Sequence, residues 1–313
     1  TQALTQGVVY NIVIWFVSHW KPSAAFSLKA LMQLWAFGFR MFLSGVLDIT
    51  FKRLDIMIIG KLFSPATLGY FNLAKSLDGM VVNYSSGSLM SVLFPVLSKV
   101  NNDLQRFQNI IIKSLVILVF IVFFFLGGLY LVSHELIILL FGEKWFQSVE
   151  YFKILLFSGF GYPISALLVN VLSSRGNSKA FLRLEIYKKI IFGTNLAVGF
   201  VWGIEGYLYG LFFATLLAVL LNIVYASHEI NLSKKQFIKP IIIQMILTVA
   251  VTLLVQFLIR DLALGILFMF LFNGFDYVVL YLITNKILNT DAYNYFMNEA
   301  NPAYRKLVNK LRK

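Results

Sequence analysis

The sequence predicts an all-α fold, a polytopic bundle of about nine transmembrane helices. Hydrophobic residues make up 59% of the 313-residue chain and charged residues only 13%, against about 45–50% and about 25% in an average soluble domain. Runs of about 20 apolar residues recur between polar breaks, which is the length that a hydrocarbon core about 30 Å thick requires. Basic residues collect in alternate connections between these runs, as they do on the cytoplasmic side of membrane proteins.

The same composition excludes several classes of protein. A soluble enzyme of this size would need more charge to cover its surface, and a disordered chain would be less apolar. The absence of cysteine excludes a disulfide scaffold and a cysteine-based metal or redox site. We therefore interpret the net charge of +13 as loop charge and expect no nucleic-acid partner.

Nine apolar runs are predicted to span the membrane as helices, because lipid offers no partner for free backbone amides. The runs cover residues 3–18, 33–60, 67–96, 110–132, 149–172, 184–202, 206–227, 238–259 and 262–285. Tight outer turns are expected at Gly203 and at Arg260-Asp261, and Pro163 is expected to kink the fifth run. After Pro302 the chain is either an interfacial amphipathic helix or a frayed basic tail.

The distribution of Lys and Arg predicts the orientation. Of the 27 basic residues, 19 lie in the C-terminal tail and in or beside the connections after the first, third, fifth and seventh runs, whereas three lie in the other connections. The basic connections and the C-terminus are therefore expected in the cytoplasm, and residue 1 outside. Together with an initial Thr in place of Met, this leads us to expect the C-terminal portion of a longer protein.

Polar residues concentrate in the second and third runs. In the second run Arg40, Ser44, Asp48 and Lys52 follow at intervals of four and Asp55 comes three later, so all five share one helical face. A charge that faces lipid at mid-depth costs at least about 2.5–3.5 kcal/mol. This stripe must therefore face the bundle interior or water. The predicted cavity-lining, substrate-binding residues of both runs are Arg40, Ser44, Asp48, Lys52, Arg53, Asp55, Lys75, Asp78, Asn83 and Tyr84.

Two interpretations of these residues remain open. Asp48 with Lys52, and Asp55 with Lys52 or Arg53, could neutralise each other and hold helices together. The number of charges and small polar side chains exceeds what pairing needs, which favours a hydrated cavity for a polar substrate. The two runs carry one surplus positive charge, a weak indication of an anionic substrate. For Asp276, in the ninth run, we expect a packing role.

Catalytic signals are absent from the sequence. His19, His134 and His228 are far apart, so no metal cluster is predicted. Gly60-Lys61 lacks the upstream glycine and the following hydroxyl residue of a phosphate-binding loop. We expect neither enzymatic activity nor a cofactor.

Several short motifs together resemble a known family. They are Arg53-Leu-Asp55-Ile-Met-Ile-Ile-Gly60, Leu68-Gly69-Tyr70-Phe-Asn-Leu-Ala74, Trp20-Lys-Pro22, Phe94-Pro95 with Asp103, Phe141-Gly-Glu-Lys-Trp145 and Arg175-Gly176-Asn177. In this order and spacing the chain resembles the second half of bacterial polysaccharide-unit (Wzx-like) flippases, which belong to the multidrug/oligosaccharidyl-lipid/polysaccharide exporter superfamily.

The resemblance implies a domain organisation, because members of this superfamily have two six-helix lobes around a central cavity. Residues 1–25 would be the last helix of an N-terminal lobe that is otherwise missing. Residues 26–230 would form the second six-helix lobe, 231–286 an accessory C-terminal helix pair, and 287–313 a basic cytoplasmic tail.

The resemblance also implies a function, the movement of undecaprenyl-diphosphate-linked oligosaccharide units across the bacterial cytoplasmic (inner) membrane by alternating access of the two lobes. The implied partners are this lipid-linked oligosaccharide, membrane lipids, the missing lobe and polysaccharide assembly proteins. The cations of the predicted set would attract the diphosphate, and its acids, Asn83 and Tyr84 would orient those cations or bind sugar hydroxyls.

Three alternatives remain open. A small-cation or drug antiporter of the same superfamily would favour a net acidic cavity. An integral-membrane polysaccharide polymerase or ligase would need an ordered outer loop with catalytic Arg or His, and the predicted outer loops are short. The third alternative is a non-transporting scaffold.

Overall fold

The computed structural model describes residues 2–17, 27–259 and 265–298, and within these ranges only the backbone at 2–4, 30, 33, 52, 53, 55, 81–92 and 94. The elements are α1 (Gln2–Val17), α2 (Leu28–Leu62), α3 (Pro65–Lys99), α4 (Leu104–Phe141), the 3-10 turn η1 (Glu143–Trp145), α5 (Phe146–Gly159), α6 (Gly161–Ser174), α7 (Ser178–Glu229), α8 (Lys234–Ile259) and α9 (Ile266–Ile287). A short helix follows over 291–298. The described residues contain no strand, which confirms the predicted all-α class.

The chain divides into two compact units. Unit 1, Thr1–Phe39, holds α1 and the first part of α2, and unit 2, Arg40–Lys313, holds the remaining helices. In unit 1, residues 5–17 of α1 are exposed although most of them are apolar. A helix that is apolar on all sides and unburied is typical of a segment in contact with lipid.

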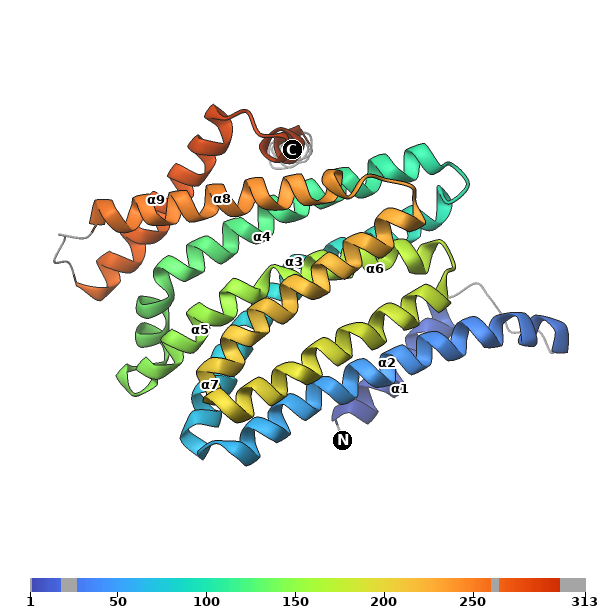
Figure 1. The fold of residues 1–313 in the computed structure, drawn as a ribbon, viewed down its shortest axis with the longest axis horizontal. Helices are drawn as coiled ribbons and strands as arrows, with labels where there is room; N and C mark the ends of the chain where they lie inside the picture. The colour runs from blue at the N-terminus through green and yellow to red at the C-terminus, as the bar shows by residue number, and fades with distance from the viewer. Residues whose placement is uncertain (1, 18–26, 260–264, 299–313) are drawn as a thin grey trace. The chain divides into compact units, whose positions relative to one another are not determined.

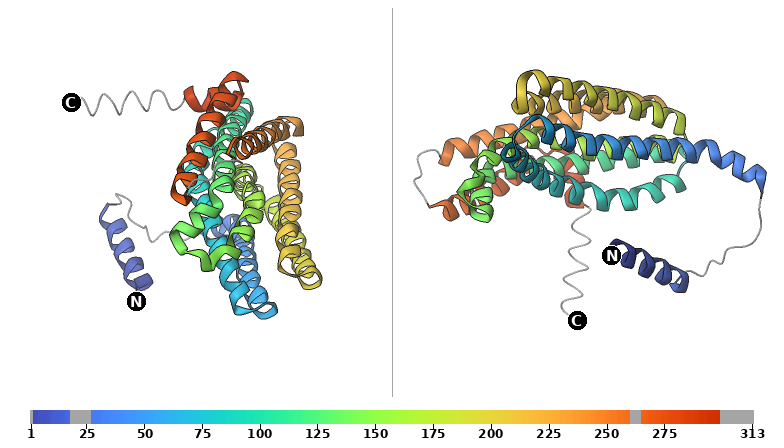
Figure 2. Two further views of the ribbon diagram at one scale, coloured as in Figure 1. Left: turned by 90° about the vertical axis from the view of Figure 1, so that its left-hand side faces the viewer. Right: turned by 90° about the horizontal axis from the view of Figure 1, so that it is seen from below.

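Five helical segments of the described chain are long and apolar enough to cross a membrane: α4, Glu143–Ser174, α7, α8 and α9. The 35-residue helices α2 and α3 are also long enough, but they contain the charged residues identified above. Figure 1 shows α2, α4 and α7 with roughly aligned axes, as in helices that share a bilayer, while α9 crosses α8 obliquely; Figure 2 gives two further views of the bundle. The protein is a multi-pass membrane protein, as predicted.

Two predicted irregularities are present. The fifth run is split into α5 and α6 at Phe160, and Pro163 lies in the first turn of α6, where its missing N–H costs no helical hydrogen bond. The sixth and seventh runs both belong to α7, which turns sharply at Gly203 (φ 75°, ψ −167°). The predicted turn at Arg260-Asp261 and the predicted tail after Pro302 lie outside the described residues.

Two apolar cores share α4. The larger core packs α4 against α3, α5, α6 and α7, and centres on buried side chains such as Phe71, Phe107 and Phe152. The smaller core packs the opposite side of α4 against α8 and α9, around Phe120 and Tyr281. Helix α4 therefore joins the helix pair α8–α9 to the rest of unit 2. Figure 1 shows α4, α8 and α9 as neighbours.

Polar side chains fasten α9 to α4. The Tyr277 hydroxyl donates to the Phe123 carbonyl at 3.2 Å, and the Tyr281 hydroxyl lies 2.9 Å from both the Phe120 carbonyl and Gln244 Oε1. Each bond ends on a backbone carbonyl or a buried amide. In a membrane, where apolar surface alone gives helices little reason to associate, such bonds fix the register of a helix pair.

The turn at Gly203 gives a test of the helical hairpin. Its backbone angles lie in a region that only glycine enters readily, and no atom would contact an added Cβ. Gly203→Ala should therefore lower the free energy of unfolding by about 1–3 kcal/mol through backbone strain alone. Thermal unfolding in detergent measures this loss.

The matched control is Gly265→Ala, since Gly265 has a negative φ of −61° and equally open surroundings. Equal stabilities of the two variants would show that Gly203 does not adopt this turn.

Candidate functional site

A cavity of about 460 Å³ lies in unit 2 between α2, α6 and both halves of α7. Its lining comprises Met41, Ser44, Gly45 and Asp48 of α2, Ser158 of α5, Gly161, Tyr162, Ser165, Ala166 and Val169 of α6, and Phe181, Glu185, Lys188, Lys189, Phe192, Thr215 and Ala218 of α7. Charged side chains, hydroxyl groups and three aromatic rings thus surround one space inside a membrane-spanning bundle.

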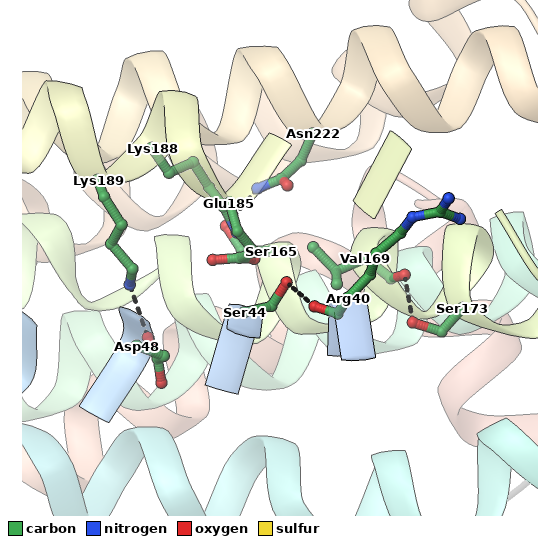
Figure 3. Close-up of polar contacts among 10 residues, drawn as sticks. All are labelled: Arg40, Ser44, Asp48, Ser165, Val169, Ser173, Glu185, Lys188, Lys189 and Asn222. Atoms are coloured by element: carbon green, nitrogen blue, oxygen red, sulfur yellow. Dashed lines mark hydrogen bonds and ion pairs between the residues drawn. The ribbon is translucent and has the colours of Figure 1, made fainter. Parts of the chain in front are cut away.

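Two ion pairs lie in this cavity. Lys189 Nζ lies 2.7 Å from Asp48 Oδ1, which connects α7 to α2, and Lys188 pairs closely with Glu185 one turn earlier on α7. Figure 3 shows Lys189 and Asp48 pointing toward each other across the space between the helices. The Asp48 side chain is 38% exposed and the Lys189 side chain 12%. The Asp48 pair is therefore accessible on one side and is not sealed in the protein interior.

Helical spacing explains why these residues meet. On α2, Ser44 and Asp48 are four residues apart, and on α7 Phe181, Glu185 and Lys189 follow at intervals of four. Residues four apart lie on one helical face. These charged faces of α2 and α7 are turned toward one another, and this keeps Asp48 and Lys189 out of lipid.

Arg40 lies two helical turns before Asp48 on α2, about 12 Å along the axis at 1.5 Å per residue. Its Nη1 donates to Ser178 Oγ at 3.3 Å, at the first residue of α7, and Ser44 Oγ donates to the Arg40 carbonyl at 2.9 Å. Arg40 is therefore beside the first residue of α7 and outside the cavity lining, whereas Asp48 lies further along α7 at Lys189.

The two described polar residues predicted on α3 lie elsewhere. Lys75 Nζ is 5.2 Å from the centre of the Phe71 ring. Asp78 Oδ1 lies so close to Gly159 of α5 that an added Cβ there would be 2.9 Å from it. Neither residue lines the cavity. The structure describes only the backbone at five further predicted positions, Lys52, Arg53, Asp55, Asn83 and Tyr84. The substrate-binding role of the whole set therefore remains a prediction.

The sequence analysis missed the contribution of α7. Lys188 and Lys189 were counted with the basic connection after the fifth run, and Glu185 was not considered. The structure places all three within the helix, on the cavity side. The sequence signal that could have identified them is helical spacing, which places residues 181, 185, 188, 189 and 192 on one face of a helix. The predicted orientation does not depend on these two lysines, because the excess of basic residues on that side is large without them.

Neutral polar groups complete the site. Asn222 Nδ2 donates to Ser165 Oγ at 2.8 Å, while Asn222 Oδ1 is buried without a hydrogen-bond partner among the described residues. No group of three or more His, Cys, Asp or Glu residues that could hold a metal occurs in the described part of the chain. The arrangement can bind hydroxyl groups and, through its ammonium groups, an anion.

The Asp48–Lys189 pair can be tested by removing one partner. Lys189→Met leaves the Asp48 carboxylate inside the bundle without this ammonium group, and we expect a loss of about 1 kcal/mol. Fully buried pairs lose about 3–5 kcal/mol, but Asp48 is partly exposed. The double variant Asp48→Asn/Lys189→Met should recover most of the loss.

The measurement is thermal unfolding in detergent, with Lys179→Met as a control on an exposed lysine of the same helix. A Lys189→Met protein as stable as this control would contradict a structural contribution of the pair.

Comparisons with known proteins agree with this architecture. Residues 1–150 match the family described as "Polysaccharide biosynthesis protein". The chain is 25% identical over 183 residues to an uncharacterized membrane protein in the cps region of Klebsiella pneumoniae, 23% over 184 residues to the lipopolysaccharide biosynthesis protein WzxC of Escherichia coli, and 25% over 201 residues to the teichuronic acid biosynthesis protein TuaB of Bacillus subtilis.

These alignments cover 58–61% of this chain but only 37–39% of the relatives, so the chain spans less than half of their length in the matched region. Among solved structures, the lipid II flippase MurJ in an inward closed conformation superposes with a TM-score of 0.62 at 16% identity, over 86% of this chain and 57% of MurJ. This last likeness shows the fold. The resemblance predicted from the sequence motifs is thus confirmed: the chain is similar to bacterial polysaccharide biosynthesis proteins, WzxC among them.

Proposed function

We propose that this chain forms part of a carrier, rather than an enzyme, that moves an undecaprenyl-diphosphate-linked oligosaccharide across the bacterial cytoplasmic membrane for surface polysaccharide synthesis. The observation that supports this most directly is the charged, hydroxyl-lined cavity inside the bundle. The names of the relatives, which refer to lipopolysaccharide and teichuronic acid synthesis, point to the same class of substrate.

The physical requirement for such a carrier is a polar path. A sugar hydroxyl that enters hydrocarbon without a hydrogen-bond partner costs several kcal/mol, and an oligosaccharide carries many of them. Ser44, Ser165 and Thr215 offer hydroxyl groups to replace water, and Tyr162 and Phe181 offer flat apolar surfaces. The isoprenoid tail needs none of these groups, because it can remain in the bilayer.

The diphosphate is expected to interact with cations. On the predicted orientation, α2 enters the membrane from the cytoplasmic side, so Arg40 is reached before the deeper Lys189. Charge-assisted hydrogen bonds from guanidinium and ammonium groups to phosphate are stronger than neutral ones. A diphosphate would thus meet Arg40 first and then compete with Asp48 for Lys189.

Alternating access would require one lobe to move against another. In unit 2, the break between α5 and α6 at Phe160 lies beside the cavity, whose lining includes Ser158 and Gly161 from its two sides. We propose this break as the point at which the cavity widens or narrows. Unit 2 supplies one wall of the path, and the activity belongs to the complete carrier.

The test uses a strain whose surface polysaccharide depends on this gene. Replacing Arg40 and Lys52 together with Ala should abolish surface polysaccharide at normal protein levels, because two of the predicted phosphate-binding cations are removed. Lys189→Ala should reduce it about tenfold or more, the effect of losing one charge-assisted hydrogen bond. Surface polysaccharide is measured by immunoblot or by staining of cell extracts.

Lys61→Ala is the control, since Lys61 is an exposed lysine at the far end of α2. Unchanged export in the Arg40/Lys52 variant would refute the assignment. A loss of drug tolerance with intact polysaccharide would instead indicate the antiporter.

A further inference from the structure

A second cavity, about 280 Å³, lies at one end of α8, away from the site described above. It is lined by Val116 of α4, by Lys239, Pro240, Ile243, Gln244 and Leu247 of α8, by Leu288, Asn289 and Thr290 of the connection after α9, and by Asp291 and Ala292 at the start of the helix 291–298. On the predicted orientation this is the cytoplasmic end of the bundle. The smaller apolar core lies directly beneath it, since Gln244 and Ala292 are buried.

The rim of this cavity is held by hydrogen bonds. Asn289 has a positive φ of 47°, and the N–H groups of Asn289 and Thr290 donate to the carbonyls of Lys286 and Asn285 at 3.1 Å. The Asn285 side chain accepts from Gln244 Nε2 and from Thr290 Oγ1, both at 2.9 Å. The connection is therefore fixed to α8 and its shape is defined before any ligand arrives.

The charges that line this cavity are opposite in sign and unpaired. Lys239 of α8 and Asp291, the first residue of the helix 291–298, both face it. Neither side chain forms an ion pair or hydrogen bond with the other, or with any other residue that the structure describes. A cation and an anion that share a cavity without touching are complementary to a ligand that carries both charges a short distance apart.

The position along α8 identifies a lipid. At 1.5 Å per residue the 26 residues of α8 extend about 39 Å, which places both ends at the level of the headgroups of a bilayer. Lys239 is five residues from the start, about 8 Å into the helix. Ile243 and Leu247 follow it at intervals of four on the same face. Polar groups at headgroup depth, above an apolar stripe, match a headgroup with its acyl chain.

We propose that this cavity binds the headgroup of a zwitterionic aminophospholipid, a phosphoethanolamine lipid, with Lys239 at the phosphate and Asp291 at the primary ammonium. A phosphoglycerol headgroup has no positive charge to compensate Asp291, and a choline headgroup has no N–H to donate to the carboxylate. The site would fix a lipid against the α8–α9 pair. This proposal is independent of the substrate proposed above.

The experiment measures lipid retention by native mass spectrometry of the purified 313-residue chain. The chain is titrated with phosphatidylethanolamine, phosphatidylglycerol and phosphatidylcholine that have the same acyl chains. We expect phosphatidylethanolamine to bind about tenfold more tightly than either of the others, as the gain of one charge-assisted hydrogen bond predicts. Asp291→Asn should remove this preference, and Lys239→Gln should weaken the binding of all three lipids.

The matched control is Lys235→Gln, an exposed lysine one turn earlier on α8 that does not line the cavity. Asp291→Asn and Lys239→Gln should keep the thermal stability of the parent, because neither altered side chain has a partner within the described protein. Equal binding of the three lipids, tighter binding of phosphatidylglycerol, or equal effects of Lys239→Gln and Lys235→Gln would each overturn the proposal.

Discussion

The structure depends on one constraint, that a charge within the hydrocarbon layer must have a partner or water. Asp48 on α2 meets this constraint through Lys189 on α7, at 2.7 Å. The pair fixes which faces of α2 and α7 are turned toward each other. The cavity follows from this arrangement, because the small residues Ser44 and Gly45 line it beside Asp48 and leave room there. The proposed binding site and the packing of the two helices therefore depend on the same side chains.

Helix α4 shows how an apolar element complements this polar one. It is the most apolar of the candidate spans and contributes to both cores, one on each side. Apolar packing gives little specificity in lipid, where tails are as apolar as leucine. The register of α9 on α4 is therefore set by hydroxyl groups that reach backbone carbonyls, from Tyr277 to Phe123 and from Tyr281 to Phe120.

Local sequence signals predicted the features that local physics decides. Run length predicted the spans, and the glycine at 203 predicted a turn that has positive φ. The intervals of four on α2 placed Ser44 and Asp48 on one face, and both line the cavity. The partner of Asp48 could not be predicted in this way, because Lys189 is 141 residues away and its contact depends on how α7 packs. The same limit applies to Asp78, whose polarity suggested the cavity but whose helix packs it against Gly159.

The charge balance of the cavity bears on how the proposed carrier would release its cargo. Asp48 and Glu185 face Lys188 and Lys189, so the four groups are formally neutral together. A diphosphate that binds Lys189 must displace Asp48, and part of the gain from the new contact is lost with the old one. When the diphosphate leaves, Asp48 is again available to Lys189, so neither charge remains uncompensated. The exchange between Asp48 and the diphosphate would thereby limit the affinity for the substrate and ease its release. Transport requires this, because a carrier that bound its substrate too tightly could not release it on the far side.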